Sequence, residues 1–407
     1  MSKIFPHPES AGLYGIFNDS FPPILDGVTL AVENYVYWLK QMGKNPCIVT
    51  PWNPVSSPAC CDVMKFFSLP IRSRKPYRYG YPKLDPFIWK RLRDTDFKIV
   101  HAHCPFSSGR LGVYVKRMRN VPLIGTFHSK YKEDLKHSFS RAPWMVNIIM
   151  KRILDFFNAC DEVWIPQAQV EDTVREYGYK GPLTVVENGN DFASIIKGNL
   201  WEHKSNSKKE LGIDEKAIAL LFVGQHIWEK GLDIVVETLR LLDGDVNFIM
   251  NFIGTGYAFD EIKNRINEYG LSDRVTIHGV ISDRVTLSKY YAASDLFLFP
   301  SFYDNAPLVV REAAAMGTPS VLLSGSTASE VISDRRNGFL TRRSPEEFAA
   351  LVKYISLHPD LLHSVAEGAR STLIRSWRDV VEEVADRYET LINSYVCHPA
   401  ASLSVTI

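Results

Sequence analysis

Short apolar segments alternate with helix-like segments along most of the chain, and this alternation limits the fold more than any other feature. Apolar segments with the length of buried strands lie at residues 13–17, 47–50, 99–102, 122–126, 163–166, 217–224, 246–254, 275–278 and 296–300. Segments with helical periodicity lie between them, at residues 30–42, 232–242, 260–269 and 287–293. Strands that alternate with helices form parallel sheets from βαβ units. The sequence therefore predicts an α/β protein with doubly wound parallel sheets.

A polar, lysine-rich stretch at residues 192–210 interrupts the alternation and predicts an exposed linker. The length of 407 residues allows two domains, since one domain has roughly 100–200 residues. We predict one Rossmann-like domain at residues 1–195 and a second at residues 196–378. A C-terminal helix within residues 379–407 is expected to pack back on the first domain. Ser344, followed by a proline and two glutamates, marks a further helix start.

The composition excludes several classes of protein. The net charge is +1, which gives no sign of nucleic-acid binding. No apolar run of about 18 residues occurs, so no transmembrane helix is expected, and the N-terminal residues lack the apolar stretch of a signal peptide. The six cysteines show no Cys-x-x-Cys spacing, which predicts a reduced, cytoplasmic compartment.

Ligands bind at the carboxyl ends of the strands in open parallel sheets, so the residues after each predicted strand are candidates for function. Gly27 precedes a helix and would let backbone amides approach an anion, although a plain glycine turn gives the same pattern. His128 follows a strand, where a structural or surface histidine is the competing interpretation. Lys230 precedes another helix beside Gly231. A lysine at a helix start opposes the helix dipole, so this position favours phosphate binding over a solvated side chain.

Two carboxylates flank a further helix start. Asp304 follows a predicted strand, and Glu312 lies eight positions later in a helix begun by Pro307, with Asn305 or Ala306 as its cap. Helical side chains lean toward the N-terminus, so Glu312 can point back toward Asp304. About four free amide groups of the first turn lie between the two acids. This arrangement suits a hydroxyl-rich ligand that carries a phosphate, and a helix with two unrelated acids is the alternative.

Other motifs are weaker. Residues 94–96 and 243–245 have the Asp-x-Asp form that binds a divalent metal and a nucleotide diphosphate, but each precedes a strand and predicts a turn. His101 and His103 lie on one face of an extended segment, yet no third zinc ligand is near in sequence. Residues 254–256 resemble part of a dinucleotide fingerprint whose third glycine is missing, so an NAD-linked enzyme is a poor fit.

Over nearly all its length the chain resembles the family 4 retaining glycosyltransferases, whose GT-B fold has two Rossmann-like domains that face each other across a cleft. The resemblance lies in the stretches FPPILDGVTLAVENYVYWLKQMG, VGQHIWEKGLDIVVETL and DNAPLVVREAAAMGTPSVLL, of which the last resembles the family's Glu-x7-Glu motif. It implies that the first domain binds the acceptor and the second binds the nucleotide sugar.

The resemblance also implies catalytic roles for His128, Asp304 and Lys230. Lys230 would neutralise the donor diphosphate, Asp304 would hold hydroxyls of the donor sugar, and Glu312 would bind the ribose. Gly27 would approach the diphosphate from the first domain, and His128 would contact the sugar near the reacting centre. The other residues placed at the donor are Gly224, Gln225, Gly254, His278, Val280, Asn305, Ala306, Pro307, Leu308 and Val309.

The implied reaction transfers a hexose from a nucleotide-diphospho-sugar, with UDP as the expected nucleotide. The anomeric configuration is retained by front-face attack, and neither a metal ion nor a cofactor is required. Three residues depart from the family pattern. Gln225 replaces an arginine, Asp26 replaces a glycine, and Asp304 replaces a glutamate. Asp26 would repel a diphosphate unless it points away, so it is expected to serve the acceptor or the hinge. The departures at Gln225, Asp26 and Asp304 leave a non-catalytic nucleotide-sugar-binding protein as an alternative.

Two basic stretches with interspersed aromatic residues bear on the acceptor. Residues 71–93 hold eight Lys or Arg against one Asp, and residues 130–153 hold six against two acids. This pattern suits an anionic membrane surface, although a solvated basic face is the alternative. We expect a peripheral protein on the cytoplasmic face that glycosylates a membrane lipid or a lipid-linked or envelope saccharide, while a soluble acceptor stays open. The residues expected at the acceptor or membrane are Lys130, Lys132, Arg141 and Trp144.

Overall fold

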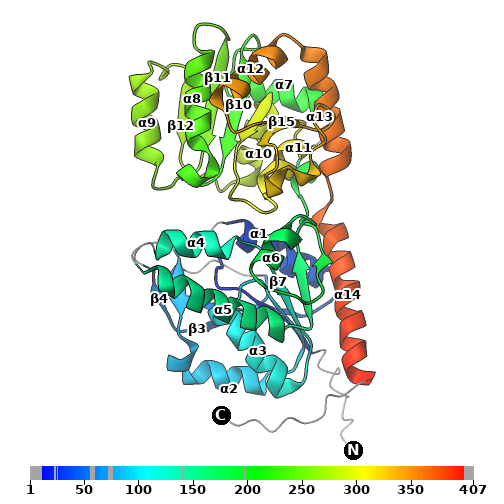
Figure 1. The fold of residues 1–407 in the computed structure, drawn as a ribbon. Helices are drawn as coiled ribbons and strands as arrows, with labels where there is room; N and C mark the ends of the chain where they lie inside the picture. The colour runs from blue at the N-terminus through cyan, green and yellow to red at the C-terminus, as the bar shows by residue number, and fades with distance from the viewer. Residues whose placement is uncertain are drawn as a thin grey trace, which may run out of the picture. The chain divides into compact units, whose positions relative to one another are not determined.

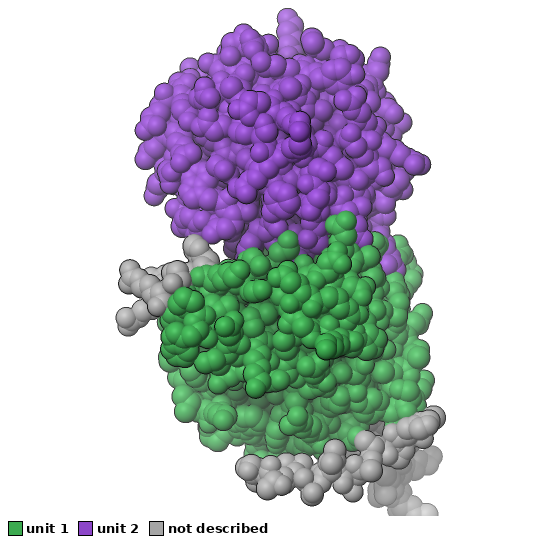
Figure 2. Space-filling view, viewed as in Figure 1, with its two compact units in different colours: residues 1–187, 377–407 green, residues 188–376 purple. Residues whose placement is uncertain are grey.

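The computed structural model describes residues 12–22, 24, 26–55, 60–71, 77–139, 142–196 and 198–397. The chain divides into two compact units (Figure 2). Unit 1 comprises residues 1–187 and 377–407, and unit 2 comprises residues 188–376. The first division lies earlier than the expected one between residues 195 and 196, because Phe192 is already buried in the core of unit 2.

Unit 1 contains a sheet flanked by helices (Figure 1). The strands of this parallel sheet have the order β3-β2-β1-β6-β7-β8-β9. Its strands are β1 (Leu13–Phe17), β2 (Pro46–Pro51), β3 (Asp62–Phe66), β6 (Phe97–Ala102), β7 (Leu123–Thr126), β8 (Glu162–Ile165) and β9 (Thr184–Val185). The strand register places Ala102 beside both Phe17 and Gly125, so the carboxyl ends of β1, β6 and β7 lie together. A small antiparallel pair, β4 (Ser68–Pro70) and β5 (Arg78–Gly80), lies outside this sheet.

The helices of unit 1 connect these parallel strands. They are α1 (Gly27–Gln41), α2 (Pro86–Asp94), α3 (Ser107–Arg119), α4 (Tyr131–Ser138), α5 (Pro143–Ala159) and α6 (Val170–Glu176), with a short 3₁₀ helix η1 (Pro82–Leu84). The C-terminal helix α14 (Trp377–Cys397) packs against α1. The Tyr388 hydroxyl lies 2.6 Å from His101 Nδ1, and the ring of Trp377 meets Tyr35 edge to face. These buried contacts tie α14 to unit 1.

Unit 2 repeats the same architecture with the parallel order β12-β11-β10-β13-β14-β15. The strands are β10 (Ile218–Val223), β11 (Phe248–Ile253), β12 (Val275–His278), β13 (Leu296–Phe299), β14 (Ser320–Leu323) and β15 (Phe339–Thr341). The helices are α7 (Leu200–Glu210), α8 (Leu232–Leu242), α9 (Phe259–Glu268), α10 (Arg284–Ala293), α11 (Leu308–Ala315), α12 (Pro345–Ser356) and α13 (Pro359–Leu373). Short 3₁₀ helices are η2 (Phe192–Ser194), η3 (Trp228–Lys230) and η4 (Thr327–Val331). Both units are therefore Rossmann-like, as predicted.

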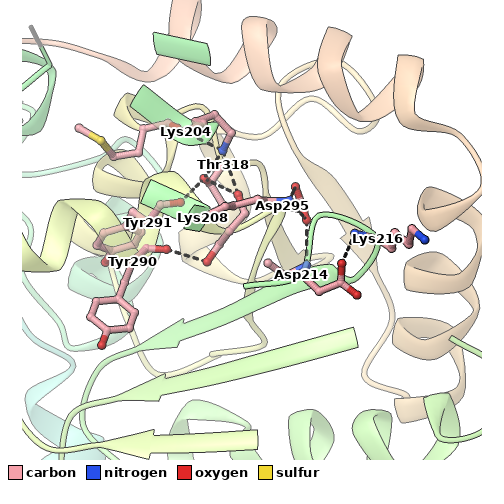
Figure 3. A network of polar contacts seen from close by, with 11 residues as sticks. Lys204, Lys208, Asp214, Lys216, Tyr290, Tyr291, Asp295 and Thr318 are labelled. Atoms are coloured by element: carbon pink, nitrogen blue, oxygen red, sulfur yellow. Dashed lines mark hydrogen bonds and ion pairs between the residues drawn. The ribbon is translucent and has the colours of Figure 1, made fainter. Parts of the chain in front are cut away.

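The expected linker is largely a helix. Residues 200–210 form α7, and Asn199 caps it by accepting from the Trp201 amide at 2.8 Å. The Lys204 ammonium is buried and donates to the Ser294 carbonyl at 2.9 Å, and Lys208 pairs with Asp295 at 2.8 Å (Figure 3). The lysine-rich composition suggested solvent exposure, but these lysines satisfy acceptors at the end of α10. None of the described helices is long and apolar enough to cross a membrane.

Candidate functional site

Two glycines let the carboxyl ends of β10 and β11 approach each other closely in unit 2. Gly224 and Gly254 both adopt positive φ, at 153° and 135°. A Cβ atom on Gly254 would lie 1.9 Å from the Gly224 carbonyl oxygen, so any larger residue would force the strands apart. The Gly224 and Gly254 amides donate to the Ile253 and Gly279 carbonyls at 3.0 and 3.2 Å, so the two glycines are needed for the close approach of the backbone.

Lys230 is fixed next to the end of β13. It is the last residue of η3 and is 9% exposed. Gly231, with φ 73°, is the N-cap of α8, and a Cβ atom there would lie 2.2 Å from the Pro300 carbonyl oxygen. Lys230 Nζ lies 2.9 Å from Asp304 Oδ1 and 3.1 Å from Oδ2. Lys230 is therefore a mostly buried, paired cation, and the interpretation as a solvated side chain is wrong.

Asp304 lies in the loop after β13 and has two partners. Its Oδ2 atom accepts a hydrogen bond of 2.6 Å from the Ser301 hydroxyl, and both its oxygens face Lys230. The Ser301 hydroxyl accepts in turn from the Tyr303 amide at 3.1 Å. The structure thus joins Asp304 and Lys230 as an ion pair, a contact that the sequence did not reveal.

The helix after this loop begins one residue later than predicted. Pro307 is the N-cap of α11, with ψ 123°, so neither Asn305 nor Ala306 is the cap and Pro307 is not in the first turn. Because the backbone at Pro307 is extended, the first amides of the helix are those of Leu308 and Val309. These two amides form the start of a helix beside Asp304, where the field of the helix favours an anion.

Glu312 is held by partners that sequence reasoning missed. It is 4% exposed, and its Oε1 and Oε2 atoms accept from Arg284 Nη1 at 2.8 Å and from the Tyr291 hydroxyl at 3.0 Å. Arg284 also pairs with Asp191 at 2.5 Å. Burial raises the pKa of Tyr291, and the neighbouring Glu312 raises it further. The sequence did hold a signal for a functional role of Arg284. Arg284 follows Asp283, the N-cap of α10, and a cation at a helix start opposes the helix dipole.

The remaining donor candidates occupy the edge of unit 2 around β10 and β12. Gln225 is exposed directly after Gly224. His278 ends β12, and its Nε2 atom lies 2.9 Å from Asn251 Oδ1, while burial lowers its pKa. Val280 is 58% exposed beyond it. His278 and Val280 therefore lie at and beyond the carboxyl end of β12, the strand next to β11, where a base could pack.

Gly27 is the first residue of α1 in unit 1. The residue before it, Asp26, is the N-cap, and its Oδ1 atom accepts from the Thr29 amide at 2.7 Å. The Tyr77 hydroxyl donates to the other oxygen at 3.0 Å. The Asp26 carboxylate thus caps a helix, while the expectation that Asp26 serves the acceptor or the hinge stays a prediction. This capping also explains why an acid is tolerated beside Gly27.

His128 belongs to a group of three histidines at the ends of β6 and β7. Its Nε2 atom lies 3.0 Å from His103 Nδ1, and the two rings are stacked with centroids 5.3 Å apart. The His103 ring lies on His101, with centroids 4.0 Å apart. Burial lowers the pKa of His128 to about 4, so the imidazole is neutral at neutral pH. The sequence motif that was weighed as a weak zinc site thus contacts the candidate catalytic histidine.

The four acceptor candidates differ in their surroundings. Lys132 pairs with Glu176 at 3.2 Å and lies over the ring of Tyr177, so it has partners within the fold. Lys130 is the N-cap residue of α4. Trp144 is 65% exposed in the first turn of α5. Arg141 lies outside the described residues.

Unit 2 brings several of the residues expected at the donor to one edge of its sheet. Gly224 and Gly254, the start of α11 and the Lys230 cation lie around the ends of β10, β11 and β13. Backbone amides and one lysine are the groups that bind phosphate. Among the described residues, no cluster of three or more His, Cys, Asp or Glu side chains could hold a metal ion.

Two family models match the chain. The model of the glycosyl transferases group 1 matches residues 203–372, and the model of glycosyltransferase family 4 matches residues 25–193. The first match covers most of unit 2 and includes Lys230, Asp304 and Glu312. The second covers most of unit 1 and includes Gly27 and His128.

Two proteins of named activity are similar to this chain over most of its length. An alpha-monoglucosyldiacylglycerol synthase of Streptococcus pneumoniae is 24% identical over 361 residues, which cover 87% of this chain and 80% of that protein. A D-inositol 3-phosphate glycosyltransferase of Xylanimonas cellulosilytica is 26% identical, and the match covers 72% of each chain.

A solved structure has the same fold. Anabaena Alr3699/HepE, crystallised in complex with UDP and glucose, superimposes with a TM-score of 0.74 at 16% identity and covers 93% of this chain and 100% of its own. The fold is thus GT-B, and the two models together span both units. The chain belongs to the family 4, group 1 glycosyltransferases.

Proposed function

We propose that this glycosyltransferase moves a hexose, with retention of configuration, from a UDP-sugar to a membrane lipid or to a lipid-linked or envelope saccharide. The observation that carries this proposal is the pairing of Lys230 with Asp304 beside the start of α11. A cation, helix amides and a carboxylate are gathered there, and these groups match the diphosphate and the hydroxyls of a nucleotide sugar.

In the proposed reaction the donor diphosphate lies on the Gly224 edge and the first amides of α11. Lys230 moves from Asp304 to the diphosphate and stabilises the charge that grows as the sugar–phosphate bond breaks. Asp304, released from Lys230, accepts hydrogen bonds from hydroxyls of the sugar. His128 contributes a neutral imidazole near the reacting carbon. The acceptor hydroxyl attacks the face that the phosphate leaves, and that phosphate oxygen takes its proton.

No metal ion or cofactor is part of this proposal, since Lys230 and the helix amides supply the positive field. Turnover should therefore be unchanged after chelation with EDTA. A loss of turnover that added Mg²⁺ restores would contradict this part of the proposal.

The lipid acceptor is supported by the similarity to monoglucosyldiacylglycerol synthases and by the surface of α5. Trp144 and Ile148 are 65% and 46% exposed, and Lys151 and Arg152 are exposed one to two turns later. This spacing places the apolar and basic side chains on one face of the helix, as in peripheral membrane helices.

Vesicle co-sedimentation tests the membrane contact. The wild type should bind anionic vesicles at low salt, and Trp144→Ser should bind less. Leu357→Ser is the matched control, because Leu357 is 78% exposed in unit 2 and lies outside the proposed surface. Equal binding of all three proteins, or no binding of the wild type, would remove the membrane from the proposal.

A soluble phosphorylated polyol is the second candidate acceptor, favoured by the similarity to D-inositol 3-phosphate glycosyltransferases.

A thermal-shift series with UDP-, GDP-, ADP- and TDP-sugars tests the donor. A ligand present at 100 times its dissociation constant adds about 2.7 kcal/mol of stability, which gives a measurable shift. We expect the largest shift with a UDP-sugar. No shift with any nucleotide sugar would contradict the proposed function.

A further inference from the structure

We propose that His103 is the positioning residue of His128, whose imidazole it holds in one orientation and one tautomer with Nε2 directed at His103. The inference rests on the proposed function, in which His128 contacts the donor sugar. It assigns a purpose to a buried histidine that the reaction itself does not use.

The backbone fixes the position of both histidines. His103 directly follows β6, and its amide donates to the Phe17 carbonyl of β1 at 2.8 Å. His128 follows the neighbouring strand β7, and Gly125 of that strand is in register with Ala102. Because the two strands are hydrogen-bonded neighbours, the two imidazoles meet at the same edge of the sheet.

The surroundings of His103 prevent its ring from turning. His103 is 1% exposed, with the Tyr35 ring edge to face at 5.2 Å and the His101 ring at 4.0 Å. The His101 ring is fixed in turn by the Thr126 hydroxyl at Nε2 and the Tyr388 hydroxyl at Nδ1, both at 2.6 Å. A chain of packed rings thus runs from α14 to His128.

The 3.0 Å distance between the two nitrogens requires one shared proton. One ring donates and the other accepts, so the hydrogen bond exists only while at least one of the rings is neutral. Burial lowers the pKa of both His103 and His128, so both rings are neutral at neutral pH. Nε2 of His128 is therefore committed to His103.

Side-chain ¹⁵N NMR of the full-length protein, labelled at histidine, tests the bond without any substrate. In the wild type, His128 should show one neutral tautomer near pH 7, and its resonances are assigned by their loss in His128→Phe. In His103→Phe, which keeps an aromatic ring but removes the hydrogen bond, His128 should show both tautomers. An unchanged tautomer in that variant would overturn the inference.

His103→Asn provides a conservative second variant, because its amide reaches the position of Nδ1. We expect it to retain a single tautomer of His128 and most of the turnover. Thr126→Val is the matched control, since it removes a hydrogen bond from His101 in the same group of rings. The control should lose stability yet keep the tautomer of His128.

Kinetics then separate positioning from a merely structural role. Release of UDP from UDP-glucose should fall about tenfold in His103→Phe through kcat, as expected from the loss of one hydrogen bond, with UDP affinity unchanged. The double variant with His128→Phe should be no slower than His128→Phe alone. Additive losses would show that His103 acts independently and would overturn the inference. If His128→Phe alone leaves turnover unchanged, the proposed role of His128 fails, while the NMR result still decides whether His103 orients it.

Discussion

Asp304→Asn should bind UDP more tightly than the wild type, although it removes a residue of the proposed donor site. In the structure the carboxylate of Asp304 pairs with Lys230, the cation proposed to bind the diphosphate, and both its oxygens lie within 3.1 Å of Lys230 Nζ. UDP must therefore separate this ion pair before it can bind Lys230. Asparagine keeps the shape of the side chain and removes the competing charge.

The magnitude follows from the burial of the pair. The side chains of Lys230 and Asp304 are 11% and 19% exposed, so their attraction is roughly 6 kcal/mol at an effective dielectric constant of about 20, before desolvation. Desolvation cancels most of this, and a hydrogen bond to a charged group contributes about 1.5–3 kcal/mol net. We expect UDP affinity to rise about tenfold, which corresponds to about 1.4 kcal/mol.

Calorimetric titration with UDP measures this directly, because UDP lacks the sugar that Asp304 is proposed to hold. Asp304→Glu is the matched control that keeps the charge, and its UDP affinity should stay near that of the wild type. Asp304→Asn should also unfold at a lower temperature without ligand, since Lys230 is left without its counter-ion, and its sugar transfer should fall. Equal or weaker UDP binding by Asp304→Asn would refute the competition.

Three further perturbations test other parts of the structure. Burial lowers the pKa of Lys204 to about 8, so between about pH 8 and pH 10.5 the folded state holds fewer protons than the unfolded state. The free energy of unfolding should therefore rise by about 3 kcal/mol as the pH is raised through this window. Urea titrations should show that Lys204→Met removes the rise. Burial lowers the pKa of His226 to about 4, so acidification from pH 6.5 to 4 should lower the free energy of unfolding by about 3 kcal/mol. Acid denaturation curves of His226→Leu should lack this decrease. An unaltered pH profile in either variant would contradict the assigned burial. Glu312→Gln should weaken UDP binding about tenfold if Glu312 binds the ribose, measured by calorimetry beside the wild type, and undiminished affinity would limit Glu312 to its contacts with Arg284 and Tyr291.

Much of the fold was accessible from the sequence because the strands are continuous apolar runs. Residues 13–17, 275–278 and 232–242 were predicted with the bounds that the structure has for β1, β12 and α8. Strands β10 and β13 are buried along their whole length, so local hydrophobicity alone identifies them. The strand β15 has only three residues, which are too few for a comparable signal.

The lysines of α7 show where local composition misleads. A lysine-rich stretch normally lies in solvent, yet Lys204 is buried because the carbonyl groups of Ser294, at the end of α10, and of Met316 accept hydrogen bonds from its ammonium group. Those acceptors are distant in sequence, and only the packing of α7 on α10 brings them together. Composition could therefore not indicate this contact.

The candidate site was predictable as a set of positions, but its contacts were not. Strand ends indicated where Lys230, Asp304 and His128 lie, since ligands gather at that edge of a parallel sheet. The ion pair of Lys230 with Asp304 and the bond of His128 with His103 depend on side-chain directions that motif spacing does not determine. The roles of these residues in catalysis stay predictions until the variants are measured.

The most direct test of the proposed donor site is a calorimetric titration of UDP into the wild type and into Lys230→Met. Methionine fills the space of the lysine stem but carries no charge, and Lys353→Met removes a partly exposed lysine of α12 elsewhere in unit 2 as the control. We predict that the wild type and Lys353→Met bind UDP alike, while Lys230→Met binds it at least tenfold more weakly. Equal UDP affinity of Lys230→Met and the wild type would contradict the assignment of this edge of unit 2 as the nucleotide-sugar site.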